Sequence, residues 1–307
     1  MINISNFCLG ISKPLNIFNQ DIRSLINLSI KKKIYFHISI SYPLTFYLLR
    51  LLINKKKLNE IKFISKILGD SEKNFIKSFD LTIKKFSIKS LHIAQIINLP
   101  VKNINNRVYE EINFYEFSKI IDKIKLFKEK GIIKRNYIQL YPGDDVQFTK
   151  KIIKHFDGVC FYANINSIFI DKGVYDYIKK NDIPCLLLSI FGNPKEKNVK
   201  DLNINSYIFT QKNFSSNTIS VGRTYNFKRF QELINYNYKN MNLDIKNEKL
   251  VFNFRNEDQE KSEIFFAHYK ITNILLLARF LFVCLLKSIL PRNIYNNLKF
   301  FKILLTK

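Results

Sequence analysis

Segments typical of buried strands alternate with segments typical of amphipathic helices through the first three quarters of the chain. The clearest repeat is Ser78–Pro100, with the sequence SFDLTIKKFSIKSLHIAQIINLP. Its first half places Phe79, Ile83 and Phe86 on one helical face and two lysines on the other. Its second half, Leu91–Leu99, is mostly apolar, as is typical of a parallel strand that is buried on both faces. This alternation predicts an α/β fold built on a parallel sheet.

The same strand–helix unit recurs about eight times. The expected strands are Ile4–Ile11, Ile34–Ile40, Ile61–Leu68, Leu91–Leu99, Lys134–Leu140, Gly158–Ala163, Cys185–Ile190 and Thr218–Val221. The expected helices are Asp21–Ile30, Tyr47–Leu58, the one that begins at Ser78, Glu116–Lys130, Asp145–His155, Val174–Asn181, Asn205–Lys212 and Phe227–Tyr238. This number of units over residues 1–238 predicts a (β/α)8 TIM barrel. A doubly wound sheet is the alternative, but no GxGxxG opens any of these helices.

The pattern ends after residue 238, so residues 239–307 are expected to form a C-terminal extension. Leu250–Phe254 resembles a short strand, and Ile271–Leu290 is very apolar but contains Arg279 and Lys287. Two cations argue against a helix that spans a bilayer. Two alternatives remain for residues 271–307. They form either an amphipathic segment lying on an anionic membrane surface or a helix packed on the outside of the barrel.

The overall charge and the cysteine pattern limit the classes of partner. The formal net charge is +25, which suits nucleic acid or an anionic membrane, but a bias toward A+T-rich codons is the favoured explanation of the abundance of lysine. No RNA- or DNA-reading motif accompanies the charge, so nucleic acid ranks last among the candidate partners. The four cysteines and four histidines are scattered, which predicts neither a metal site nor disulfides. With no signal-peptide pattern, a cytoplasmic location is expected, with peripheral attachment to the inner membrane face as an option.

Seven segments resemble the aldo/keto reductase family when they are taken in chain order. They are YFHISISYP, FISKILG, SFDLTIKKFSIKSLHI, FKEKGIIKR, FYANIN, IPCLLLSIFGNP and ISVGRTYNFKRFQEL. The resemblance covers roughly residues 4–238. It implies the barrel fold, NADP(H) as cofactor and a carbonyl or alcohol substrate, of which a sugar is one kind.

The family's chemistry uses four residues: a tyrosine general acid, a lysine that lowers its pKa, an aspartate that pairs with the lysine, and a histidine near the substrate carbonyl. The resemblance places the tyrosine at Tyr42 and the lysine at Lys66. It places the aspartate at His37 and the histidine at Asn98, so two of the four residue types have changed. Asn98 can still donate a hydrogen bond to a substrate oxygen, but it cannot supply a titratable proton. His37 either adds a positive charge when protonated or, when neutral, accepts a hydrogen bond from Lys66.

The cofactor-binding positions are also altered. The family's Gly-x-Ser after the fifth strand corresponds to Tyr137 and Gln139, and a glutamine of the sixth strand corresponds to Cys160. The positions that the resemblance still assigns to the cofactor are Asn164, Ser189, Gly222 and Arg223. A glycine followed by a cation after the eighth strand suits a nucleotide phosphate.

Two functions follow from this pattern. The first is a diverged aldo/keto reductase-like oxidoreductase that interconverts a carbonyl and an alcohol with NADP(H). The second is a catalytically inactive barrel, a pseudoenzyme, that acts as a binding or scaffold protein, with a membrane surface as one place of action.

Overall fold

A computed structural model describes most of the chain. The described residues are 6–12, 15–42, 44–100, 112–141, 146–165, 167–191, 202–215, 217–224, 226–235, 251–252, 266 and 272–289. The tail after residue 289 and most of residues 236–271, including parts of the predicted strand Leu250–Phe254, lie outside this set.

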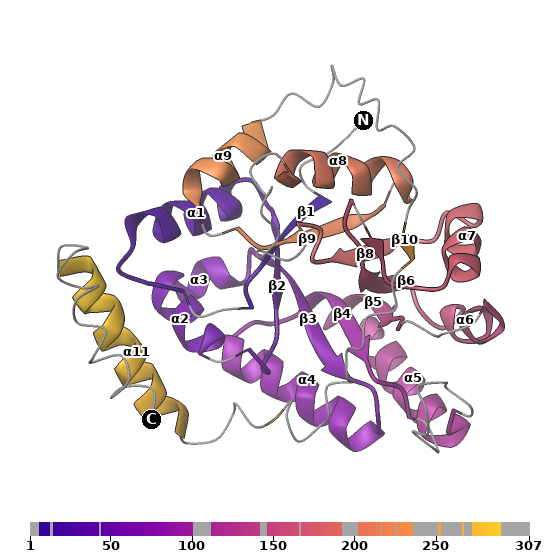
Figure 1. The fold of residues 1–307 in the computed structure, drawn as a ribbon. Coiled ribbons are helices and arrows are strands. Elements are labelled where there is room, and N and C mark those ends of the chain that lie inside the picture. The colour runs from indigo at the N-terminus through magenta and orange to yellow at the C-terminus, as the bar shows by residue number, and fades with distance from the viewer. Residues whose placement is uncertain are drawn as a thin grey trace.

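Eight parallel strands close into a barrel, and helices surround it (Figure 1). The strands are β1 (Phe7–Gly10), β2 (Tyr35–Ile38), β3 (Lys62–Leu68), β4 (Leu91–Ile97), β5 (Ile133–Gln139), β6 (Gly158–Tyr162), β8 (Cys185–Leu188) and β9 (Ile219–Gly222). Each strand pairs with the next, and β9 pairs with β1 through Cys8 and Val221 to close the ring. The predicted TIM barrel is therefore confirmed.

Helices lie around the outside of the barrel, most of them between successive strands. They are α1 (Gln20–Lys31), α2 (Thr45–Leu52), α3 (Lys55–Leu58), α4 (Glu72–Phe86), α5 (Phe114–Glu129), α6 (Val146–Ile153), α7 (Lys172–Lys180), α8 (Leu202–Asn213), α9 (Phe227–Asn235) and α11 (Thr272–Ile289). Side chains at the helix starts define several of them. The Ser71 hydroxyl, for example, accepts from the Asn74 backbone N–H, so that α4 begins at Glu72, six residues before the predicted start at Ser78.

Two further local features differ from the sequence-based prediction. The predicted helix Tyr47–Leu58 is two helices, because Ile53 is extended and the Asn54 side chain caps α3 by accepting from the Lys56 N–H. A two-residue strand, β7 (Ser167–Ile168), was not predicted. It pairs in parallel with β10 (Val251–Phe252), which lies within the predicted strand-like piece of the extension.

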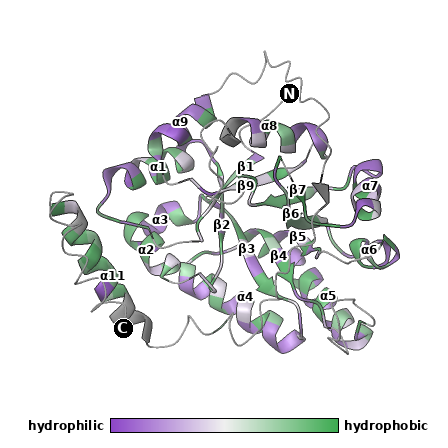
Figure 2. Ribbon diagram, in the orientation of Figure 1, coloured by the Kyte–Doolittle hydropathy of each residue, from purple (hydrophilic) through white to green (hydrophobic). Residues whose placement is uncertain are grey.

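The barrel interior is filled by side chains rather than open. Its inward-facing apolar residues form a cluster of their own: Cys8, Ile64, Ile93, Tyr137, Cys160, Leu186, Leu188, Ile219 and Val221. A second, larger cluster lies between the strands and the helices. Figure 2 shows the corresponding hydrophobic colouring along the strands. A closed, packed barrel of this kind leaves the carboxyl ends of its strands as the place for chemistry.

The helix of the C-terminal extension packs on the outside of the barrel. Leu277, Phe280 and Leu281 of α11 contact a small cluster that contains Leu44 and Leu48. Figure 1 shows α11 at one edge of the molecule, beside α2. Of the two alternatives for residues 271–307, packing on the barrel is thus observed for this helix. Among the described helices, none has the length and apolar content needed to cross a bilayer. The domain boundary at residue 238 stays a prediction.

Candidate active site

Three of the four predicted catalytic residues come together at the carboxyl ends of β2 and β3. His37 lies on β2, Lys66 lies on β3, and Tyr42 follows a tight turn in which its N–H donates to the Ser39 carbonyl at 3.2 Å. The Lys66 Nζ lies 5.5 Å from the centre of the Tyr42 ring. The ring centres of Tyr42 and His37 are 6.1 Å apart. The structure thus places a phenol, an ammonium group and an imidazole in one cluster.

His37 is uncharged at neutral pH. Its side chain is buried, and its Nε2 lies 2.6 Å from the Gln95 Oε1. Burial lowers the pKa of His37 to about 4. The hydrogen bond to Gln95 opposes this shift, and the nearby Lys66 adds to it. Because an amide oxygen only accepts, the neutral imidazole donates through Nε2. The extra positive charge considered from the sequence is therefore not expected near pH 7.

A buried amide pair extends from His37 across the barrel. Gln95 on β4 donates through Nε2 to the Gln139 Oε1 on β5 at 2.7 Å. Lys66 lies opposite Gln95 in the strand register and is near enough to lower the pKa of the Cys160 thiol, although burial raises that pKa more. The sequence analysis did not identify Gln95. The sequence did contain a sign of its role, because Gln95 is the one amide in the otherwise apolar end of LHIAQII. A buried amide requires hydrogen-bond partners.

Asn98, the fourth predicted catalytic residue, is held by its backbone and by a neighbour. It follows β4 with φ at 55°, in the left-handed region that asparagine tolerates better than most residues, and it is 6% exposed. The Tyr141 hydroxyl donates to the Asn98 Oδ1 at 3.0 Å. A Cβ on Gly69 would lie 2.7 Å from the Asn98 carbonyl oxygen, so the loop after β3 fits closely against this turn. Tyr141, which orients the Asn98 amide, was missed from the sequence.

Two of the predicted cofactor residues lie in loops at the same end of the barrel. Asn164 follows β6, and its Oδ1 accepts from the Ser167 N–H at 2.9 Å, which forms the turn into β7. Ser189 follows β8 in the left-handed region, with φ at 55°, and is exposed. Their roles in cofactor binding stay predictions.

Gly222 ends β9 and Arg223 follows it, next to the loop that follows β1. A Cβ on Gly222 would lie 2.3 Å from the Phe191 ring and 2.8 Å from the Phe7 ring, so packing alone accounts for the glycine. Arg223 is exposed, and its Nη1 donates to the Ser12 Oγ at 3.1 Å. The phosphate role predicted for these residues therefore depends on Arg223 rather than on open space above Gly222.

Comparison with known proteins identifies the fold. No model of a protein family matches the chain, and no curated protein matches its sequence. Solved structures do match. A candidate aldo-keto reductase of Pseudomonas aeruginosa has a TM-score of 0.53 at 15% identity, over 75% of this chain and 87% of that one. An aldo-keto reductase of the silkworm Bombyx mori has a TM-score of 0.54 at 12% identity, over 77% and 80%. An aldo-keto reductase of Klebsiella pneumoniae in complex with NADPH has a TM-score of 0.53 at 8% identity, over 75% and 84%.

These matches agree with the strand order and with the closed barrel. At such low identities they are informative about the fold alone. The chain has the (β/α)8 barrel fold of the aldo-keto reductases.

Proposed function

We propose that this protein is a diverged aldo-keto reductase-like enzyme that interconverts a carbonyl and an alcohol with NADP(H). The observation that carries the proposal is the Lys66 Nζ at 5.5 Å from the Tyr42 ring centre, at the carboxyl end of the barrel strands. A phenol donates a proton poorly near neutral pH unless a cation stabilises the phenolate that is left behind. Tyr42 and Lys66 supply this pair of groups.

In this mechanism Tyr42 gives its proton to the carbonyl oxygen of the substrate. Lys66 stabilises the resulting phenolate, which regains a proton from solvent after the alcohol leaves. Asn98, oriented by the Tyr141 hydroxyl, hydrogen-bonds the carbonyl oxygen and positions it. Neutral His37, hydrogen-bonded to Gln95, packs beside the Tyr42 ring and does not transfer a proton. Bound NADPH would supply the hydride that the carbonyl carbon receives.

The residues present suit the cofactor at its charged end. Arg223 is an exposed cation on the loop after β9, where it can contact a phosphate. Support for NADP(H) also comes from a structural neighbour, the Klebsiella pneumoniae aldo-keto reductase, which was crystallised with NADPH. The substrate class is a small carbonyl compound, and a sugar is one candidate.

A titration with NADPH tests this proposal. The wild-type chain should bind NADPH and change its fluorescence. Arg223→Gln should weaken binding by about ten-fold, the expected loss of a charge-assisted hydrogen bond. Arg50→Gln, which removes an exposed arginine from α2, is the matched control and should leave binding unchanged. Failure of the wild-type chain to bind millimolar NADPH would refute the cofactor assignment.

A pseudoenzyme is the second candidate, and the site itself contains the observation that favours it. Where the family has an ionisable aspartate, His37 is neutral and hydrogen-bonded to Gln95, and the histidine position holds Asn98. Under this alternative the barrel binds a nucleotide or sugar without turnover. NADPH binding without any carbonyl-dependent oxidation of NADPH, across a panel of aldehydes, ketones and sugars, would favour it.

We also propose that α11 attaches the protein to an anionic membrane surface. Ala278, Phe282, Leu285 and Ile289 follow one another at helical spacing on the face opposite the barrel, and all four are exposed. Exposed Arg279 lies beside this stripe. Apolar side chains flanked by cations suit the interface of an anionic bilayer.

Sedimentation with liposomes tests the membrane proposal. The wild-type chain should sediment with vesicles that contain an anionic lipid and remain in solution with neutral vesicles. Phe282→Glu should reduce this binding by about ten-fold because it removes apolar contact and adds repulsion. Phe114→Glu, which changes an equally exposed phenylalanine on α5, is the control. Equal binding by both variants would contradict the assignment to α11.

A further inference from the structure

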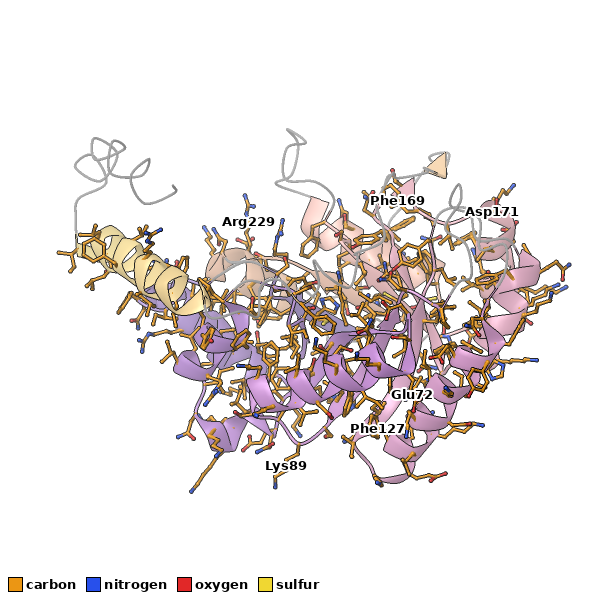
Figure 3. The ribbon with its side chains drawn as sticks, turned by 90° about the horizontal axis from the view of Figure 1, so that it is seen from below. Glu72, Lys89, Phe127, Phe169, Asp171 and Arg229 are labelled. Carbon is orange, nitrogen blue, oxygen red and sulfur yellow. The ribbon has the colours of Figure 1, made fainter. Side chains whose placement is uncertain are left out.

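The amino ends of four neighbouring barrel strands gather aromatic and basic side chains. Tyr35 begins β2 and lies opposite Lys62, which begins β3. The Lys62 Nζ lies 5.0 Å from the centre of the Tyr35 ring, and the centres of the Tyr35 and His92 rings are 5.4 Å apart. Burial raises the pKa of the Tyr35 phenol, and the charge of Arg135 on β5 opposes that effect. This cluster lies at the end of the barrel opposite Tyr42. Lys89 lies in the loop before β4, at the end of the barrel that holds this cluster, which is the lower edge of Figure 3. Phe169 lies at the opposite end of the barrel.

Positive charge at this end is not balanced by nearby ion pairs. Burial lowers the pKa of His92 to about 4, and Lys134, Lys62 and Arg135 lower it further in that order. None of these three cations forms an ion pair with a carboxylate in the part of the chain that the structure describes.

Several carboxylates lie near this end, among them Glu60 just before β3 and Glu129 at the end of α5, and in the described residues none of them is in an ion pair with Lys62, Lys134 or Arg135. Asp157, just before β6, accepts from the Lys128 Nζ at 2.8 Å through each of its oxygens and from the Asn136 N–H. Burial raises the pKa of the Cys185 thiol, and the nearby Asp182 carboxylate raises it further. The cations at the start of β3 and β5 therefore repel one another, and neither is in an ion pair within the described residues.

A buried hydroxyl points toward the same place. Tyr137 is 0% exposed, and its hydroxyl oxygen makes no hydrogen bond of regular geometry, although the Arg135 side chain lies near enough to interact with it. A Cβ on Gly158, the first residue of β6, would lie 2.9 Å from the Tyr137 Cζ, so the phenol end of the ring lies at the amino ends of the strands. Burial raises the pKa of Tyr137, and Arg135 opposes that effect from nearby. An unpaired buried hydroxyl costs stability unless a ligand or water uses it.

We propose that these groups form a binding site for a phosphate-type oxyanion at the amino-terminal end of the barrel. Arg135 and Lys62 supply the charge, and Tyr35 supplies a half-buried phenol that can donate a hydrogen bond. Arg135 already interacts with the Tyr137 phenol, so an anion held by Arg135 lies next to that hydroxyl. The ligand is inorganic phosphate or the phosphoryl group of a small phosphomonoester, and it does not take part in the chemistry at Tyr42.

Calorimetric titration of the full chain tests the site. Inorganic phosphate is one probe and glycerol 3-phosphate the other, with ionic strength held constant by sodium chloride. Arg135→Gln should lower the affinity for whichever of the two ligands binds more tightly by about ten-fold. Lys89→Gln removes an equal charge from an exposed position at the same end, so it should change affinity less than two-fold, as screened surface charges do. The ratio of the two affinities decides between free phosphate and a phosphomonoester.

Tyr137→Phe separates a binding role from a purely structural one. It should weaken phosphate binding several-fold while leaving the free protein at least as stable, because the unpaired hydroxyl is removed. Equal phosphate affinity in Arg135→Gln and Lys89→Gln, or no saturable binding of either probe, would overturn the proposal. NADPH binding should be the same in Arg135→Gln and the wild type, so failure at this site is distinguishable from failure of the proposed oxidoreductase function.

Discussion

Tyr42→Phe is expected to lower kcat/KM for NADPH-dependent carbonyl reduction by at least about 100-fold, the usual contribution of a positioned general acid. The substitution removes the only atom of Tyr42 that can give a proton to the carbonyl oxygen. It keeps the ring that lies 6.1 Å from His37 and 5.5 Å from the Lys66 Nζ. NADPH affinity should change little, since the phenol acts on the substrate. Initial rates of NADPH oxidation with a panel of small aldehydes measure the effect.

Tyr47→Phe is the matched control for this experiment. Tyr47 lies on α2, close to Tyr42 in the chain, and its ring packs against Phe46 at 4.1 Å between centres. The Tyr47→Phe substitution also removes a phenol hydroxyl, but from a residue outside the proposed site. Its activity should therefore stay near that of the wild type. Equal activity in Tyr42→Phe and the wild type would remove Tyr42 from its role. Loss of activity in both variants would point to unfolding, which a thermal melt would reveal.

The fold was largely predictable because its signals are local. Apolar, β-branched runs such as IYFHISI and KFISKIL mark strands, and the amphipathic segments between them mark helices. The predicted helix boundaries were wrong where a single polar side chain determines the start of a helix. Ser71 caps α4 before its apolar stripe begins, and Asn54 starts a new helix where a continuous one was predicted.

The site was only partly predictable because its contacts are long-range. Resemblance located Tyr42, Lys66, His37 and Asn98, since their positions follow the segment order. It did not show that His37 bonds to Gln95, 58 residues away, or that Gln95 bonds to Gln139, 44 residues further on. These contacts depend on barrel closure and strand register, which no local pattern encodes. The same reason hid the Tyr141–Asn98 hydrogen bond, across 43 residues.

The neutral His37 makes a second large effect predictable, a loss of stability in mild acid. The folded-state pKa of His37 is about 4, below its ordinary value of 6.5. Between these two values the unfolded chain binds a proton at His37 and the folded chain does not, so stability falls as pH falls. The shift corresponds to a loss of about 3 kcal/mol in the free energy of unfolding from pH 7 to pH 4. Urea unfolding at several pH values measures this slope.

His37→Gln isolates the contribution of the imidazole. A glutamine amide can still donate to the Gln95 Oε1, but it does not titrate. The variant should lose about 3 kcal/mol less than the wild type over the same pH range. His92, whose pKa is also about 4, contributes in the same direction, but it is only partly buried, so solvent screening reduces its effect. Asp70 works in the opposite direction, because burial raises its pKa and the folded chain takes up its proton first.

If the free energy of unfolding depends on pH in the same way in the wild type and in His37→Gln, that result would contradict a buried, neutral His37. They would instead imply an imidazole that is protonated in the folded state, next to the Lys66 ammonium. That arrangement would place two positive charges beside Tyr42 and strengthen its acidity at the expense of stability. A profile that flattens in the variant identifies His37 as the buried, neutral group whose protonation destabilises the fold in mild acid. Tyr42 would then be the proposed proton donor, with Lys66 as the cation that stabilises its phenolate.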